Sequence, residues 1–199
     1  PNDYVVEFVV PTGYAVSPIG GGASLSVVDD SDANATTGFT EAVTLIEGEN
    51  DPTIDAGLYL GTIGNYVWFD TDENGTQDVT ETGIGGVTVS LFTATNQLVA
   101  TVTTASDGSY LFTDVLAGDY YVIFDTPSGY VSTTQGGGAA TADDTDSDAD
   151  ASTGITGVFT LAAGADDPTI DAGFIPEPPD CQIPGIEESE LPVLCIGDE

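Results

Sequence analysis

The stretch IGNYVWFDTDENGTQDVTE, residues 63–81, joins a strand pattern directly to an acidic loop. Its beginning, 63–69, is rich in aromatic and β-branched side chains, which favours a β-strand. The residues that follow, 70–81, fit the calcium-loop pattern D-x-[DN]-x-[DN]-G-x5-E without a mismatch. A further strand pattern occupies 87–92. The sequence therefore predicts an EF-hand-like loop set between two strands, without the helices of an EF-hand.

The spacing of this loop suits calcium, which takes about six to eight oxygen ligands. Side chains at alternate loop positions converge on one centre, and Gly75 permits the sharp turn that this requires. The expected ligands are Asp70, Asp72 and Asn74 through their side chains, Thr76 through its backbone carbonyl, Asp78 directly or through water, and Glu81 with two oxygens. The alternative is an acidic turn that is merely solvated.

The charge of the chain strengthens the case for a metal. Its 199 residues include no Lys, Arg or His and 34 Asp or Glu, giving a formal charge of −34. No side-chain salt bridge can form, so the countercharge must come from metal cations, high salt or a basic partner. Nucleic acid and anionic membrane surfaces are excluded as direct partners, because binding phosphate requires cationic side chains. The sequence also contains no apolar run long enough to span a membrane.

A high net charge also favours intrinsic disorder. Against it stand a hydrophobic content of 40%, with eight Phe, eight Tyr and one Trp, and alternating apolar residues. Abundant Thr, Val and Tyr favour strands. We therefore expect an all-β protein with one or two small cores.

An internal repeat sets the domain organisation. Residues 3–59 align without gaps to 119–175, and 29 of the 57 aligned positions are identical. The offset of 116 residues matches the size of one β-sandwich domain. We expect residues 61–175 to be a complete domain and residues 1–60 to be the second half of a preceding copy. Either the chain is a slice of a longer multidomain protein, or a neighbouring subunit completes the half-domain.

The complete copy reads as about seven strands, punctuated by Gly, Asp, Asn and Pro. The predicted strands are Ile63–Phe69, Val87–Phe92, Leu98–Thr103, Tyr110–Phe112, Tyr120–Phe124, Val158–Leu161 and Thr169–Phe174. A very short linker, 59–63, joins the two copies, so we expect consecutive domains to be stiffly coupled.

A second group of acidic residues includes and surrounds the motif Asp-Ser-Asp, which occurs in both copies. We expect this motif to fold onto an acidic strand face and to bind one or two further calcium ions. The candidate ligands are Asp144, Asp146, Asp148 and Asp171 in the complete copy, and Asp30, Asp32 and Asp55 in the half copy. The alternatives are a solvated acidic loop and, for Asp171, a side chain that caps the last turn.

The last segment, 176–199, is rich in Pro and acids and carries the two cysteines, Cys181 and Cys195. Two Cys at this separation suggest a disulfide loop formed in an oxidising compartment, and two reduced thiols are the alternative. Asn34 and Asn74 lie in N-glycosylation sequons, which are low-specificity matches, and Asn74 is better explained as a ligand.

Taken together, these motifs resemble the B-type repeats of serine-aspartate repeat surface adhesins (SdrD B-like), which are related to Cna B-type domains. The segments that carry the resemblance are GNYVWFD (64–70), the acidic loop, DGSY (107–110), DSD (146–148) and TIDAG (169–173). It covers residues 1–175 and implies tandem prealbumin-like (Ig-like) β-sandwiches, calcium in each repeat and an extracellular stalk at the cell surface. Many Cna B-type domains form an isopeptide bond through Lys, which this chain cannot do.

The leading functional expectation is a calcium-stiffened structural repeat whose partners are neighbouring repeats or identical subunits of a fibre. The alternative is an adhesin module that binds a host protein or glycan through its loops. An enzyme is disfavoured, because the chain offers no His, Lys or Arg as base, electrophile or oxyanion donor. A high-salt habitat would explain the acidic surface equally well.

Overall fold

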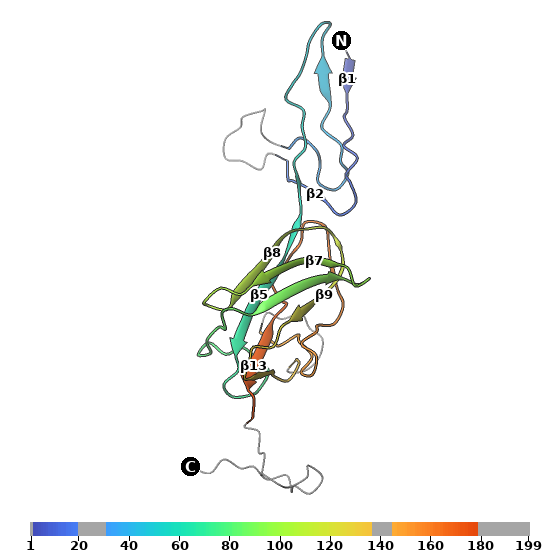
Figure 1. The fold of residues 1–199 in the computed structure, drawn as a ribbon. Helices are drawn as coiled ribbons and strands as arrows, with labels where there is room; N and C mark the ends of the chain where they lie inside the picture. The colour runs from blue at the N-terminus through green and yellow to red at the C-terminus, as the bar shows by residue number, and fades with distance from the viewer. Residues whose placement is uncertain (1, 20–30, 137–144, 179–199) are drawn as a thin grey trace, which may run out of the picture.

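The computed structural model describes residues 2–19, 31–136 and 145–178. Every regular element among these residues is a β-strand, and the strands form two successive parts of the molecule (Figure 1). The strands are β1 (Asn2–Tyr4), β2 (Ala15–Val16), β3 (Val43–Leu45), β4 (Leu58–Tyr59), β5 (Gly61–Phe69), β6 (Thr88–Thr93), β7 (Leu98–Thr103), β8 (Ser109–Val115), β9 (Gly118–Phe124), β10 (Tyr130–Ser132), β11 (Phe159–Leu161), β12 (Asp166–Asp167) and β13 (Ala172–Pro176).

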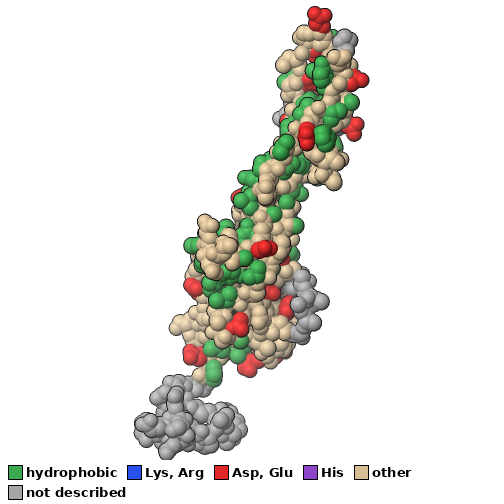
Figure 2. All heavy atoms as spheres, turned by 90° about the vertical axis from the view of Figure 1, so that its right-hand side faces the viewer, with side chains coloured by type: hydrophobic (Ala, Val, Ile, Leu, Met, Phe, Trp, Pro, Cys, Tyr) green, Lys and Arg blue, Asp and Glu red, His purple; other side chains and the backbone are tan. Residues whose placement is uncertain are grey.

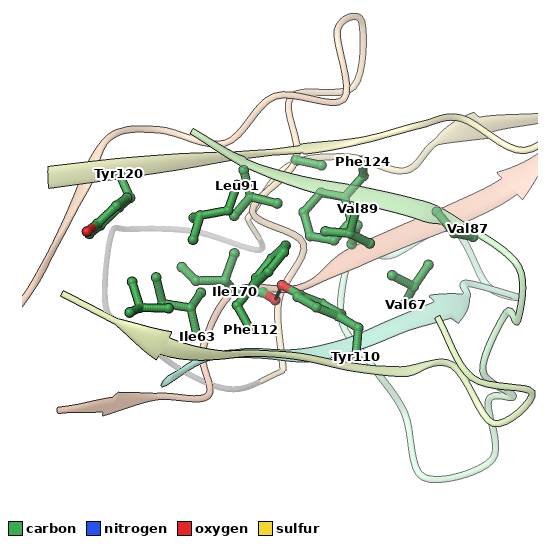
Figure 3. Close-up of a cluster of buried hydrophobic side chains, with 14 of the residues drawn as sticks. Ile63, Val67, Val87, Val89, Leu91, Tyr110, Phe112, Tyr120, Phe124 and Ile170 are labelled. Carbon is green, nitrogen blue, oxygen red and sulfur yellow. Dashed lines mark hydrogen bonds between the residues drawn. The ribbon is translucent and has the colours of Figure 1, made fainter. Parts of the chain in front are cut away.

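The second part, from β5 onward, is a sandwich of two sheets. One sheet has the order β10-β13-β5-β12, with β8 also paired to β5, and the other has the order β11-β9-β6-β7. Apolar side chains from β5 and β8 meet those from β6 and β9 between the sheets (Figure 3). The predicted all-β sandwich is confirmed. Its core forms because alternate residues of each strand point inward.

The core is dominated by large side chains that solvent does not reach. Phe112, Phe124 and Phe174 are each at most 2% exposed, and Tyr110 stacks edge-on against Phe124 with ring centroids 5.8 Å apart. The Tyr110 hydroxyl donates a hydrogen bond to the carbonyl of Ile170 (Figure 3). This bond satisfies the one polar atom that the ring brings into the core.

The direction of β5 determines where the chain enters and leaves the sandwich. Strand β5 pairs in parallel with both β12 and β13, while the remaining strand ladders are antiparallel. Because β5 begins the sandwich and β13 ends it, parallel pairing puts entry and exit at opposite ends (Figure 1). The chain therefore enters this domain at one end and leaves it at the other.

All seven strands predicted from the sequence appear in this domain, most with shifted bounds. Two short strands were not predicted, β10 and β12. Strand β12 lies between the predicted strands Val158–Leu161 and Thr169–Phe174, and its backbone is in parallel register with Thr62 and Ile63.

The first part repeats half of this architecture in the same register. Strand β1 pairs with β3 as β9 pairs with β11, and β2 pairs with β4 as β10 pairs with β13. Side-chain contacts recur as well: the Thr44 hydroxyl donates to Asp3 at 2.6 Å, and the Thr160 hydroxyl donates to Asp119 at 2.6 Å. Residues 2–59 thus fold locally like the second half of the sandwich.

The two parts touch at the junction where β4 runs into β5. The backbone N–H of Ala117 donates to the carbonyl of Gly13 at 3.1 Å. Gly13 has a φ of 93°, and a Cβ there would lie 2.8 Å from a methyl of Leu116.

Across the part of the chain that the structure describes, no helix has the length and apolarity of a membrane-spanning segment. The predicted Cys181–Cys195 disulfide and the candidate ligands Asp30 and Asp144 lie outside the described residues.

Candidate metal centre

Backbone hydrogen bonds connect both ends of the acidic loop to the sheet that contains β5. The N–H of Phe69 donates to the carbonyl of Thr82 at 2.9 Å, which closes the base of the loop. The N–H of Asp70 donates to the carbonyl of Phe174 at 3.0 Å, which ties the first loop residue to β13. These hydrogen bonds therefore fix both ends of the loop to the sheet.

Three carboxylates of the loop converge. One oxygen from each of Asp70, Asp72 and Glu81 lies within 4.8 Å of the others. Two oxygens bound to one calcium ion can be at most about 5 Å apart, since each lies about 2.3–2.6 Å from it. Asp70 is fully buried, Asp72 is exposed and Glu81 is half-buried. The group fits a hard divalent cation that one side of the site screens from water.

Asp70 is held by donors on several sides. Its carboxylate accepts hydrogen bonds from the Thr133 hydroxyl, the Gly75 N–H at 2.8 Å and the Asn74 N–H at 3.2 Å. Burial by itself raises the pKa of Asp70, but these hydrogen bonds outweigh it and lower the pKa below its ordinary value. The Asp70 carboxylate is therefore charged at neutral pH and held in a fixed position.

Two other predicted ligands, Asn74 and Asp78, are hydrogen-bonded to residues of this group. The amide nitrogen of Asn74 donates to Asp72 at 3.0 Å and to Asp78 at 3.5 Å. Glu81 accepts from the backbone N–H of Thr71 at 2.6 Å and from that of Asp78 at 3.0 Å. These contacts gather the predicted ligand residues into one connected loop.

Gly75 has a second role that its sequence position did not indicate. Its φ is 77°, as the sharp turn requires, and a Cβ there would lie 2.5 Å from the carbonyl oxygen of Thr134. The loop is thus packed directly against the segment that carries Thr133 and Thr134.

The Asp-Ser-Asp motif lies beside this loop. Thr76 and Asp146 form an antiparallel bridge, the N–H of Gln77 donates to the carbonyl of Thr145 at 2.6 Å, and the N–H of Ser147 donates to the carbonyl of Gly75 at 3.1 Å. The two acidic segments are therefore coupled through their backbones.

Asp148 and Asp171 also come together, as a reciprocal pair. The N–H of Asp148 donates to the carbonyl of Asp171 at 2.9 Å, and the N–H of Asp171 donates to the Asp148 carboxylate at 2.8 Å. The buried Asp171 carboxylate accepts from the N–H of Tyr66 at 2.8 Å. In the first part, Asp32 and Asp55 repeat the reciprocal pair at 3.0 and 2.9 Å.

The two groups of predicted ligands differ in how their carboxylates are arranged. Within residues 2–19, 31–136 and 145–178, the converging carboxylates are those of Asp70, Asp72 and Glu81. The described acids of the second group, Asp32, Asp55, Asp146, Asp148 and Asp171, are placed by backbone hydrogen bonds. Binding of a cation by this second group stays a prediction.

Thr133 is the site residue that the sequence analysis missed. It lies 63 positions from Asp70 in sequence and is 1% exposed. The one available signal was the hydroxyl that both copies carry at this place, as Ser17 and Thr133. Nothing in that signal connects it to the acidic loop, because the contact exists only in the folded sandwich.

Comparison with known proteins gives a consistent family. The family model of the SdrD B-like domain matches residues 1–58 and 61–174. Serine-aspartate repeat-containing protein D of Staphylococcus aureus (strain Newman) is 41% identical over 177 residues, which cover 88% of this chain and 12% of that protein. Protein F of the same series, from Staphylococcus epidermidis, is 36% identical over 174 residues, covering 86% of this chain and 10% of that protein.

The chain thus spans about an eighth of the length of the first of these relatives. Among solved structures, GBS52, the minor pilin of Streptococcus agalactiae, matches with a TM-score of 0.41 and 12% identity, over 87% of this chain and 85% of that one. A streptococcal ancillary pilin matches with a TM-score of 0.37 and 18% identity, over 88% of this chain and 42% of that one.

Proposed function

The chain belongs to the family of SdrD B-like domains, and we propose that it is a calcium-stiffened structural repeat of a stalk on the outside of a cell. The family supports the repeat role and the surface location. The end-to-end path of the chain through the sandwich supports the stalk, because such repeats add length when placed in series.

The observation that carries the calcium proposal is the convergence of Asp70, Asp72 and Glu81. The chain has no Lys, Arg or His to offset these charges. Two carboxylates at about 4 Å repel each other by about 4 kcal/mol at an effective dielectric of 20, so a cation is the natural counterpart. Asn74 completes the set if its amide turns to present the oxygen in place of the nitrogen.

A bound cation would stiffen more than its own loop. Through Gly75 and Gln77 the loop is bonded to the Asp-Ser-Asp segment, and through Asp70 it is bonded to β13. At millimolar calcium and micromolar affinity, one site contributes about 4 kcal/mol to the free energy of unfolding. Small domains have a net stability of about 5–15 kcal/mol, so the site would decide how firmly the domain stays folded.

Thermal unfolding followed by circular dichroism tests this function. The chain is melted in millimolar calcium, in EDTA, and in EDTA with molar NaCl. We expect calcium alone to raise the midpoint, because the carboxylates act as ligands. If NaCl raises it as much as calcium does, the acids form a screened surface and the calcium proposal is wrong.

A pair of variants locates the effect. Asp72→Asn removes a proposed ligand, whereas Asp125→Asn removes the same charge from an exposed position outside the group of converging carboxylates. We expect the calcium-dependent rise of the midpoint to shrink in Asp72→Asn and to persist in Asp125→Asn. Equal responses of the two variants would contradict a site at this loop.

A further inference from the structure

Strand β7 differs from the other strands that end a sheet in the complete domain. Among the described residues these are β7, β8, β10, β11 and β12. Strands β10 and β11 have three residues each, β12 consists of two aspartates, and β8 contains Asp114 with a φ of 58°. Short strands, charges and irregular backbone are means by which proteins prevent pairing at a sheet edge. From Val99 to Thr103, β7 shows none of them.

The sequence around β7 is neutral as well. Residues 82–106, which include β6, β7 and the turn between them, contain no charged side chain and form the longest uncharged stretch of the chain. Figure 2 shows scattered acidic side chains and no cationic one, with hydrophobic side chains at the surface between them. On β7 itself, Leu98 is 54% exposed and Val99 is 45% exposed. The edge of β7 is therefore open, partly apolar and free of carboxylates.

The backbone of β7 can accept a further strand. Among the described residues, β7 pairs with β6 alone. Thr104, just after β7, turns both of its backbone groups towards β6: its N–H donates to the Val87 carbonyl at 2.9 Å, and its carbonyl accepts from the Gly86 N–H at 3.0 Å. Successive residues of a strand alternate in this direction. The backbone groups of residues 99, 101 and 103 therefore face the open edge.

We propose that β7 is a self-association edge, at which two copies of this chain pair antiparallel about a two-fold axis at Thr101. In this register Thr101 faces Thr101 of the second copy, and Val99 faces Thr103. Cross-strand neighbours of this β-branched kind stabilise an antiparallel pair. Ala100 comes opposite Val102, and both of these side chains already pack against the core. Each side chain thus stays on its own face of the sheet.

The charge of the chain argues for a second copy as the partner. A basic peptide would be attracted to the acids, all of which lie outside residues 82–106. A second copy carries the same 34 acids and no cation, so it can approach closely only where carboxylates do not meet. Pairing at β7 satisfies this condition, because Asp107, the acid nearest to β7 in sequence, lies four residues beyond Thr103. This inference goes beyond the proposed function, since it joins separate copies laterally.

The size of the contact sets the expected affinity. The pairing uses residues 99–103 of each copy, and interfaces below about 1,200 Å² are typical of weak encounters. We therefore expect a dimer that forms at high protein concentration. Salt and calcium should both favour it, because they screen the remaining repulsion between two acidic chains.

Sedimentation equilibrium of the full chain tests the proposal at concentrations up to about 1 mM, where a dimer of millimolar affinity is detectable. It is measured in millimolar calcium and in EDTA with molar NaCl. Val99→Asp places a charge on the β7 edge. Val158→Asp, at a position 63% exposed, places the same charge next to β11, at the opposite edge of the same sheet. We expect Val99→Asp to weaken dimerisation at least about tenfold and Val158→Asp to leave it unchanged.

Chemical cross-linking tests the register. Thr101→Cys and Thr103→Cys are made separately in a chain that carries Cys181→Ser and Cys195→Ser. The two copies of residue 101 would face each other, whereas the two copies of residue 103 would lie about 14 Å apart, because each is two residues from the axis. A short bismaleimide should therefore join the Thr101→Cys variant into dimers and leave the Thr103→Cys variant monomeric.

A chain that stays monomeric at the highest concentration in both solutions overturns the proposal. Equal dimerisation of Val99→Asp and Val158→Asp overturns it as well, because another surface would then carry the association. Equal cross-linking of the two cysteine variants would exclude a two-fold axis at Thr101. Because screening by NaCl suffices for pairing, a dimer in EDTA with NaCl keeps this result separate from a failure of the calcium proposal.

Discussion

Gly75 carries two constraints at one residue, a backbone with positive φ and direct contact with a carbonyl. Gly86 shares the first constraint, with a φ of 87°, but a Cβ there would meet nothing within 4 Å. We predict that Gly75→Ala lowers the free energy of unfolding by about 2–3 kcal/mol and that Gly86→Ala lowers it by about 1 kcal/mol. Urea denaturation in calcium measures both. Equal losses would show that the contact with Thr134 has no energetic weight.

Tyr110 links the core to the acids around it. Burial, together with the charges of Asp171, Asp148 and Asp167, raises the pKa of Tyr110 well above its usual value. The folded protein holds this proton more tightly than the unfolded chain does. The resulting stability is therefore complete below the unfolded pKa of about 10 and is lost as pH rises from there toward the folded pKa.

Tyr110→Phe should change this pH dependence. At about pH 8 we predict a loss of about 1 kcal/mol, because the hydrogen bond to the Ile170 carbonyl disappears. Between about pH 10 and pH 12, the free energy of unfolding should fall less steeply in the variant than in the unaltered chain. Urea titrations across this range measure the slope. Tyr121→Phe, at a half-buried ring that bonds Asn96, is the control and should keep the steep decline.

At the scale of elements, the acidic loop depends on the segment after β10. The Thr133 hydroxyl donates to the buried Asp70 carboxylate, and valine has nearly the same shape without the donor. We predict that Thr133→Val costs about 1.5–3 kcal/mol, as expected for a hydrogen bond to a charged group. It should also weaken calcium binding, which isothermal titration calorimetry measures.

The control for this prediction is Thr113→Val. Thr113 also bonds an aspartate, Asp114, at 3.2 Å, but on the exposed surface. Its loss should cost less than about 0.5 kcal/mol and leave calcium binding unchanged. If the two variants lose the same stability, the brace between Thr133 and Asp70 is not a special contact.

The elements also show which features a sequence can predict. The strands β5, β6 and β9 have alternating or continuous apolar residues and were predicted, because burial on one face requires that pattern. Strand β12 consists of Asp166 and Asp167, which have no apolar side chain, so no apolar pattern reveals its pairing with β5. Across this pairing, the Thr62 hydroxyl donates to the Asp166 carboxylate at 2.8 Å. The loop at 70–81 could be identified as a candidate site because its proposed ligands lie within one short segment.

Contacts between distant segments were the part that the sequence could not predict. Thr133 against Asp70, and Thr76 against Asp146, join residues separated by most of the domain. Their meeting depends on how the sandwich folds. The 116-residue repeat predicted that residues 1–60 correspond to the second half of a domain. The exposure of Val6 and Leu58 became visible only once the strands were placed.

At the scale of the whole molecule, the strand pairing of the complete domain determines how it would carry tension. In the complete domain, force applied at its ends pulls β5 and β13 past each other, because they are parallel neighbours. Their ladder bonds, and those between β5 and β12, then share the load. The antiparallel pair β5 and β8 starts with Gly61 opposite Val115, so tension applied there would open its bonds one after another.

This geometry predicts that the unfolding force depends on the direction of pulling. In single-molecule force measurements on the full chain, attachment at Leu60 and Glu177 loads β5 and β13 in shear, whereas attachment at Leu60 and Leu116 unzips β5 from β8. We expect the first pair to need a severalfold higher force, because the parallel bonds must break together. Calcium should raise that force further, since Asp70 joins the loop to the carbonyl of Phe174 on β13. Equal forces in the two directions would mean that the parallel strands do not bear the load, and a stalk under tension would then need another source of strength.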